Sequence, residues 1–143
     1  MRRVLGLDVG DRRIGVAMSD PLGLTAQGLM VVERHGGAGD VEAVRALVEQ
    51  HGVETVVVGL PLTMRGEQGP QAKKVIDFSD ALKRRISVPI ELVDERLTTV
   101  QGARALRDTG ASRQRRKAII DQVAAQLILQ QFLDRGRESA PPR

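Results

Sequence analysis

The chain has 143 residues, 41% of them hydrophobic and 28% charged, with a net charge of +4 and no cysteine. This length suits one domain with a single core, and no apolar run approaches the roughly 18 to 20 residues that a membrane-spanning helix needs. Because the N-terminus also lacks the long apolar segment of a signal peptide, we expect a cytoplasmic protein that does not enter a membrane.

Three successive strands are predicted in the N-terminal part of the chain. Residues 4–9 and 14–18 are short apolar runs, which are typical of buried strands. Because only residues 10–13 separate these runs, we expect them to form an antiparallel hairpin. Residues 29–32 predict the third strand.

Helices and strands alternate over the middle of the chain. Asp40 is a good N-cap for a helix that extends to about residue 50 and ends at Gly52. Residues 55–58 are β-branched throughout, which favours a parallel strand buried on both faces. The pattern then predicts a loop over residues 62–69, a helix over 70–85 and a fifth strand over 90–93.

Two helices are predicted in the C-terminal part. Thr98 and Gln101 form a capping-box pattern that starts a helix running to residue 108, and Gly110 favours its end. Ser112 is expected to cap the last helix, which extends to residue 133. We therefore expect one domain over residues 1–135 and a flexible tail over residues 136–143.

This order of elements predicts an α/β fold. Three antiparallel strands are followed by two strands that are reached through crossover helices. They imply a five-stranded mixed sheet with helices on both faces. No internal repeat or low-complexity segment interrupts the order.

Three carboxylates that are far apart in the sequence each lie in an apolar setting: Asp8, Glu95 and Asp121. An isolated ionised carboxylate in apolar surroundings is costly, so such groups are usually paired, protonated or bound to a metal. Each acid taken singly is more often structural than catalytic. Placed at the ends of the first and last strands and on a late helix, the three together favour a site that holds divalent metal for phosphoryl chemistry.

Each acid also has an alternative interpretation. Asp8 shares a strand face with apolar residues and could accept backbone hydrogen bonds from the glycine turn that follows. Asp121 lies near small alanines that would let its helix approach the sheet, and it could pair with Lys117. Asp94 points to the opposite face from Glu95 and could serve in its place.

The 22 basic residues are mostly arginine, and they cluster at two places. Residues 83–85 end a predicted helix, where cations complement the helix dipole. The second cluster leads into the last helix, where cations oppose the dipole and a phosphate partner such as nucleic acid is favoured. With two phenylalanines as the only aromatics, the expected contacts are to the backbone rather than to stacked bases. The second cluster consists of Arg113, Arg115, Arg116 and Lys117.

Four motifs in order carry a family resemblance over about residues 4–133. The chain resembles the YqgF family of RNase H-like proteins, in which these motifs occur in the same order. It departs from the family pattern at Thr63 and Arg65, where more amide or acidic character is expected, and at Gly102, which interrupts a helix. The motifs are Gly6-Leu7-Asp8-Val9-Gly10 with Arg13-Ile14-Gly15-Val16-Ala17 and Ser19-Asp20; Gly59-Leu60-Pro61-Leu62 with Gly66; Asp94-Glu95-Arg96-Leu97-Thr98-Thr99; and Lys117 with Asp121, Ala124 and Ala125.

The resemblance implies a five-stranded RNase H-like fold and a hydrolase that cleaves nucleic acid. Asp8, Glu95 and Asp121 would be its catalytic and metal-binding acids. Oxygen ligands without cysteine or clustered histidine suit Mg²⁺ or Mn²⁺, and we interpret His35 and His51 as structural. The candidate phosphate contacts are Arg13, Arg96, Arg113, Arg115, Arg116 and Lys117, each of which has a solvated surface position as the alternative.

Family members are described as nucleases that mature the small-subunit ribosomal RNA precursor and as Holliday junction resolvases. We favour endonucleolytic maturation of the 5′ end of that precursor, because the chain offers a small phosphate-binding surface and no clear dimer signal, so that a monomer or weak dimer is expected. The first alternative is a Holliday junction resolvase acting on branched DNA. Lower alternatives are a nucleotide-binding protein of the actin and sugar-kinase type, which would need two lobes, and a non-catalytic RNA-binding scaffold.

Overall fold

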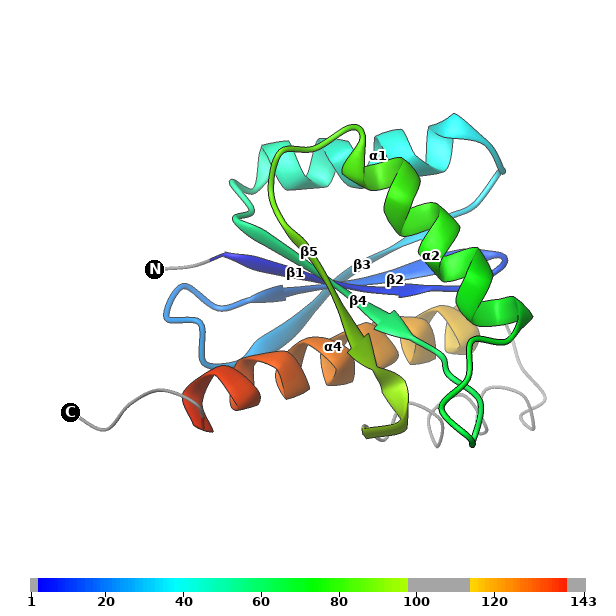
Figure 1. Cartoon of the computed structure of the whole chain (residues 1–143). Coiled ribbons are helices and arrows are strands. Elements are labelled where there is room, and N and C mark those ends of the chain that lie inside the picture. Colours follow the sequence, from blue (N-terminus) through cyan, green and yellow to red (C-terminus); the bar gives the residue numbers. More distant parts are fainter. Residues whose placement is uncertain (1–2, 98–113, 139–143) are drawn as a thin grey trace.

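The structure is a computed structural model that describes residues 3–97 and 114–138. Strands dominate the first half of the chain, and the last described element is a long helix (Figure 1). The elements are, in chain order, β1 (Val4–Val9), β2 (Arg13–Ser19), β3 (Ala26–Glu33), α1 (Ala38–Gln50), β4 (Thr55–Leu60), α2 (Pro70–Lys83), β5 (Ile90–Asp94), the short 3₁₀ turn η1 (Glu95–Leu97) and α4 (Gln114–Glu138).

Within the described residues the strands form a single five-stranded sheet in the order β3-β2-β1-β4-β5. The pairs β1–β2 and β2–β3 are antiparallel, whereas β1–β4 and β4–β5 are parallel. The predicted hairpin, the parallel strand after the first helix and the mixed five-stranded sheet are therefore confirmed. In the hairpin, Asp8 lies opposite Gly15.

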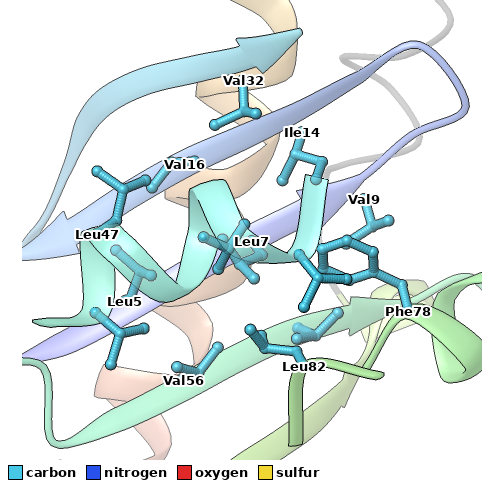
Figure 2. Packing of buried hydrophobic residues seen from close by; sticks show 14 of the residues in the cluster. Leu5, Leu7, Val9, Ile14, Val16, Val32, Leu47, Val56, Phe78 and Leu82 are labelled. Atoms are coloured by element: carbon cyan, nitrogen blue, oxygen red, sulfur yellow. The ribbon is translucent and has the colours of Figure 1, made fainter. Parts of the chain in front are cut away.

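Helices cover both faces of the sheet, with α1 and α2 on one side and α4 on the other (Figure 1). The alternation of side chains along each strand explains the two layers, because successive residues point to opposite faces. Figure 2 shows the first layer, where Leu5 and Leu7 of β1 pack near Leu47 of α1 and Leu82 of α2.

The second layer lies beneath α4, where small residues let the helix come close to the sheet. Ala124 and Ala125 are fully buried there, together with Ile128 and Leu129. A Cβ on Gly6 of β1 would lie only 2.7 Å from the Cβ of Leu129, so this position needs glycine. The sequence prediction that small residues draw this helix toward the first strand agrees with the packing.

Asp40 is not the N-cap of α1, contrary to the prediction. The helix begins at Ala38 after Gly37, which has φ 73°, and Asp40 lies buried in the first turn. Its carboxylate accepts hydrogen bonds from Arg34 Nε at 3.0 Å and from the backbone N–H groups of His35 at 3.0 Å and Gly36 at 3.1 Å. Burial raises the pKa of Asp40, but these bonds outweigh it and hold the pKa below its ordinary value.

Several element ends also differ from the predictions. The strands β2, β3, β4 and β5 are all longer than the apolar runs that predicted them, because backbone pairing continues beyond the ends of those runs. The helix α2 ends at Lys83 rather than at residue 85. The helix α4 continues to Glu138, so the first residues of the predicted tail are helical. The predicted helix over residues 98–108, with Thr98, Gln101, Gly110 and Ser112, lies outside the described residues.

Candidate active site

The candidate site lies where β1, β4 and β5 end, on the face of the sheet that α4 covers. Asp8 is near the end of β1, in the middle of the sheet, and is only 2% exposed. Its partner on β2 is Gly15. On the other side Leu7 pairs with Val58 of the parallel strand β4, so the next residues, Asp8 and Gly59, are neighbours as well. Asp8 therefore stands between two glycines.

Gly15 is the point at which α4 touches the sheet beside Asp8. A Cβ on Gly15 would lie 2.0 Å from the backbone oxygen of Asp121 and 2.6 Å from its carbonyl carbon. The backbone of Asp121 thus rests directly on the residue that pairs with Asp8. Asp121 is 4% exposed and belongs to the same buried layer.

Gly59 makes room for the third acid on the opposite flank of Asp8. A Cβ on Gly59 would lie 2.6 Å from Oε1 of Glu95 and 2.4 Å from Cδ1 of Ile128 in α4. The Glu95 side chain therefore folds back from the start of η1 over β4, where it is 1% exposed. The structure brings the three predicted acids to one face, with Asp8 in the middle.

A buried arginine holds one of these acids. Arg13 begins β2, is 8% exposed, and donates from Nε to Oδ2 of Asp121 at 2.8 Å. The alternative interpretation of Arg13 as a solvated surface residue is therefore wrong. Over residues 3–97 and 114–138, no three acidic or histidine side chains form a ready-made metal-binding group. The three acids lie on one face of the sheet, but the Asp121 carboxylate accepts its hydrogen bond from Arg13.

Asp94 has a different partner from its neighbour Glu95. Its carboxylate accepts from Arg96 Nε at 3.1 Å to each oxygen, from Arg96 Nη2 at 2.7 Å and from the Arg96 backbone N–H at 2.9 Å. The guanidinium of Arg96 holds the pKa of Asp94 below its ordinary value. This geometry favours Glu95 over Asp94 as the acid that accompanies Asp8.

The predicted phosphate contacts are only partly described. Arg96 is occupied by Asp94, and Arg13 by Asp121. Arg115, Arg116 and Lys117 lie in the first part of α4, shortly before Asp121, but their side chains lie outside the described parts, as does the whole of Arg113.

Gly15 and Gly59 are parts of the family motifs, but the sequence predicted no role for either of them in the packing of the site. Gly15 and Gly59 each lie inside a strand, with an apolar residue on either side. A glycine inside a strand marks a close approach of another backbone or group, so a signal was present. What approaches them, Asp121 and Glu95, depends on packing between distant segments.

Comparisons with known proteins agree on a single family. A family model described as "RuvX: Holliday junction resolvase" matches residues 2–135. A protein of Moorella thermoacetica is 52% identical over 133 residues, which cover 93% of this chain and 95% of that protein. A protein of Clostridium botulinum strain Hall is 48% identical over 132 residues, which cover 92% of this chain and 96% of that protein. Both are named "Putative pre-16S rRNA nuclease".

Solved structures confirm the predicted RNase H-like fold. Thermus thermophilus RuvC in complex with a Holliday junction substrate has a TM-score of 0.59 at 19% identity, and the match covers 100% of both chains. The fowlpox virus resolvase with Holliday junction DNA has a TM-score of 0.52 at 9% identity, covering 93% of this chain and 97% of that one. At these identities the likeness concerns the fold alone.

Proposed function

This chain belongs to the RuvX family, and from that membership we propose that it is a divalent-metal-dependent endonuclease that cleaves phosphodiester bonds. The observation that carries the proposal is the placement of Asp8 between Gly15 and Gly59, with Asp121 resting on one glycine and Glu95 on the other. Buried carboxylates gathered from three separate elements are costly unless a cation balances them. Such a group is the usual means of holding metal for phosphoryl chemistry.

The donor chemistry fits Mg²⁺ or Mn²⁺. The candidate ligands are three buried carboxylates, one of which, Asp121, is paired with the guanidinium of Arg13. All three donors are hard oxygens, the ligands that these ions prefer. Asp8, Glu95 and Asp121 would hold the ion or ions. A bound ion would lower the pKa of a coordinated water and stabilise the leaving oxygen.

The protein's own residues would position the substrate around these acids. Asp8, on the central strand, fixes where the acids meet, and the apolar layer beneath α4 limits the access of bulk water to them. Arg13 keeps the Asp121 carboxylate in one orientation. We propose that Arg113, Arg115, Arg116 and Lys117, which precede Asp121 in the sequence, bind the phosphate backbone on its way to the acids.

We propose the ribosomal RNA precursor as the substrate. Relatives that match nearly their full length carry names specifying pre-16S rRNA, whereas the family model's description specifies Holliday junctions. The relatives weigh more, because they are about half identical to this chain over almost all of it. We propose that the protein acts in the cytoplasm, and that it does so as a monomer or weak dimer. The family description keeps branched DNA as the second candidate.

Cleavage assays with acid variants test the activity. Wild type should cleave a pre-16S rRNA fragment with Mg²⁺ or Mn²⁺ and not with EDTA, faster than it cleaves a four-way DNA junction under matched conditions. Asp8→Asn and Asp121→Asn should each lower the rate at least about a hundredfold, since a metal ligand is lost. Asp11→Asn is the matched control, because Asp11 is an exposed acid three residues after Asp8 in the chain. Asp11 forms an ion pair with Lys74.

Two results would contradict the proposal. Cleavage by Asp8→Asn at the wild-type rate would show that this group of acids does not catalyse the reaction. Faster, symmetric junction cleavage would place the resolvase function first.

A further inference from the structure

The loop between β4 and α2 displays an apolar side chain next to the candidate site. Met64 is 87% exposed, the most exposed of the large hydrophobic residues in the described parts of the chain. Arg65, beside it, is exposed as well. A single exposed apolar residue is common on protein surfaces and alone means little. What distinguishes Met64 is the way in which the structure holds it.

The loop is a closed turn with Met64 and Arg65 at its tip. The Gly66 N–H donates to the Thr63 oxygen at 2.8 Å, and the Thr63 N–H donates to the Glu67 oxygen at 2.9 Å. The Glu67 N–H also donates to the Thr63 hydroxyl at 3.1 Å. Gly66 has φ 81°, a conformation that closes the turn and that other residues rarely adopt. Met64 and Arg65 are thus the two central residues of a fixed turn.

Arg96 joins this turn to the acidic site. While it binds Asp94, its Nη1 also lies 3.5 Å from the Met64 oxygen, and a Cβ on Gly66 would lie 3.1 Å from Nη1. Asp94 and Arg96 are the two chain neighbours of Glu95. The turn therefore contacts Arg96 directly, and through Arg96 it is linked to Asp94, so its tip lies beside the two residues that flank a candidate catalytic acid.

We propose that the Met64–Arg65 turn is a substrate-contacting element, in which Met64 packs against an unstacked base beside the scissile phosphate and Arg65 binds the adjacent backbone. This inference rests on the proposed nuclease function and adds a base-contacting surface to it. The partner is a nucleic-acid strand with an unpaired or distorted nucleotide, because only such a strand presents the face of a base to a protruding side chain. Methionine is one of the apolar residues that proteins insert at base steps.

Charge and composition support this choice of partner. The chain has almost no aromatic residues to stack on bases, so a polarisable thioether is the available substitute. The exposed cation next to Met64 complements a phosphate rather than an apolar protein surface. The turn also follows the candidate site closely in the chain, since it comes a few residues after Gly59 of β4, over which the Glu95 side chain lies.

Binding and cleavage assays on Met64 variants test the inference. Met64→Gln should raise the KM for the RNA fragment about tenfold, through loss of an apolar contact. In the Asp8→Asn background, where binding can be measured without cleavage, the same substitution should raise the Kd for the RNA fragment about tenfold. Met64→Leu should stay within about twofold of wild type, because it keeps the apolar contact. Arg65→Ala should reduce the salt slope of binding by about one. Met30→Gln is the matched control, as Met30 is a half-exposed methionine on the edge strand β3.

A 2-aminopurine placed beside the cleavage site gives a readout that a merely structural role would not change. Its fluorescence should change on binding to wild type and to Met64→Leu, and much less with Met64→Gln. Equal KM, Kd and fluorescence for Met64→Gln and wild type would overturn the inference. That failure is distinct from failure of the nuclease proposal, which would appear as unchanged cleavage by Asp8→Asn.

Discussion

Replacing Gly15 with alanine should damage both the fold and the site, because the new methyl group meets the backbone of α4. Its Cβ would lie 2.0 Å from the Asp121 oxygen, whereas an ordinary contact begins near 3.4 Å. A backbone oxygen cannot rotate away as a side chain can, so the helix must retreat by roughly 1 Å or more. The retreat loosens the packing of the residues that α4 buries, including Ala125 and Leu129.

The expected loss follows from this geometry. Overpacking of a core commonly costs about 1–3 kcal/mol, and a backbone clash belongs at the upper end. For a chain of this size the unfolding entropy is about 0.3 kcal/mol per kelvin, so a loss of about 3 kcal/mol lowers Tm by about 10 °C. A displacement of about 1 Å at Asp121 should lower kcat on the RNA fragment about a hundredfold. Calorimetry and single-turnover cleavage measure the two effects.

Gly28→Ala is the matched control for Gly15→Ala. It also places alanine on a strand beneath α4, but its Cβ meets the side chain of Gln122, at 2.4 Å from Nε2 and 2.8 Å from Cγ. That side chain can move, so we expect a loss below about 1 kcal/mol and near-normal cleavage. Equal Tm and kcat for the two variants would refute the explanation that contact between Asp121 and Gly15 sets the height of the helix.

Two further predictions concern ion pairs away from this contact. Arg13→Gln should lower the free energy of unfolding without metal by about 3–5 kcal/mol, because the buried Asp121 carboxylate loses its guanidinium partner. In thermal melts, Mg²⁺ should stabilise this variant more than wild type. An equal Mg²⁺ response would contradict the role given to Arg13. Asp40→Asn should cost about 1.5–3 kcal/mol at pH 7. Since the folded pKa of Asp40 lies below its ordinary value, this stabilisation is present above pH 4 and is lost as pH falls through the folded pKa. Urea melts of the two proteins should therefore converge in acid, and a difference constant from pH 7 to pH 2 would disprove the assignment.

The features that the sequence predicted well are those that depend on local pattern. The alternation in β1 placed Asp8 on the face of Gly6, and the short gap before β2 required a hairpin. The alanines after Asp121 correctly predicted a helix packed close to the first strand. These properties follow from the period of side chains along a strand or helix, which neighbouring residues determine.

The features that the sequence did not predict depend on distant segments. Arg13 and Asp121 are joined by a hydrogen bond across 108 positions, and no local pattern pairs them. Asp40 fits the composition of an N-cap, but its carboxylate binds Arg34 and the backbone before the helix, and the N-cap is Gly37, three residues earlier. The sequence favours Glu95 and leaves Asp94 as an alternative, because the alternation of β5 ends at Asp94 and a 3₁₀ turn begins at Glu95.

The three acids rest on elements that differ in their resistance to local opening. Asp8 belongs to the central strand, whose backbone is bonded to a neighbour on each side, while Glu95 follows β5, which has one neighbour and lies at the edge of the sheet over residues 3–97 and 114–138. Opening an edge strand breaks fewer bonds than opening a central one, so the amides of β5 should exchange with solvent before those of β1. The site would therefore come apart at Glu95 while Asp8 keeps its place in a folded sheet. A cation held by both Asp8 and Glu95 would couple the opening of β5 to the opening of the central strands.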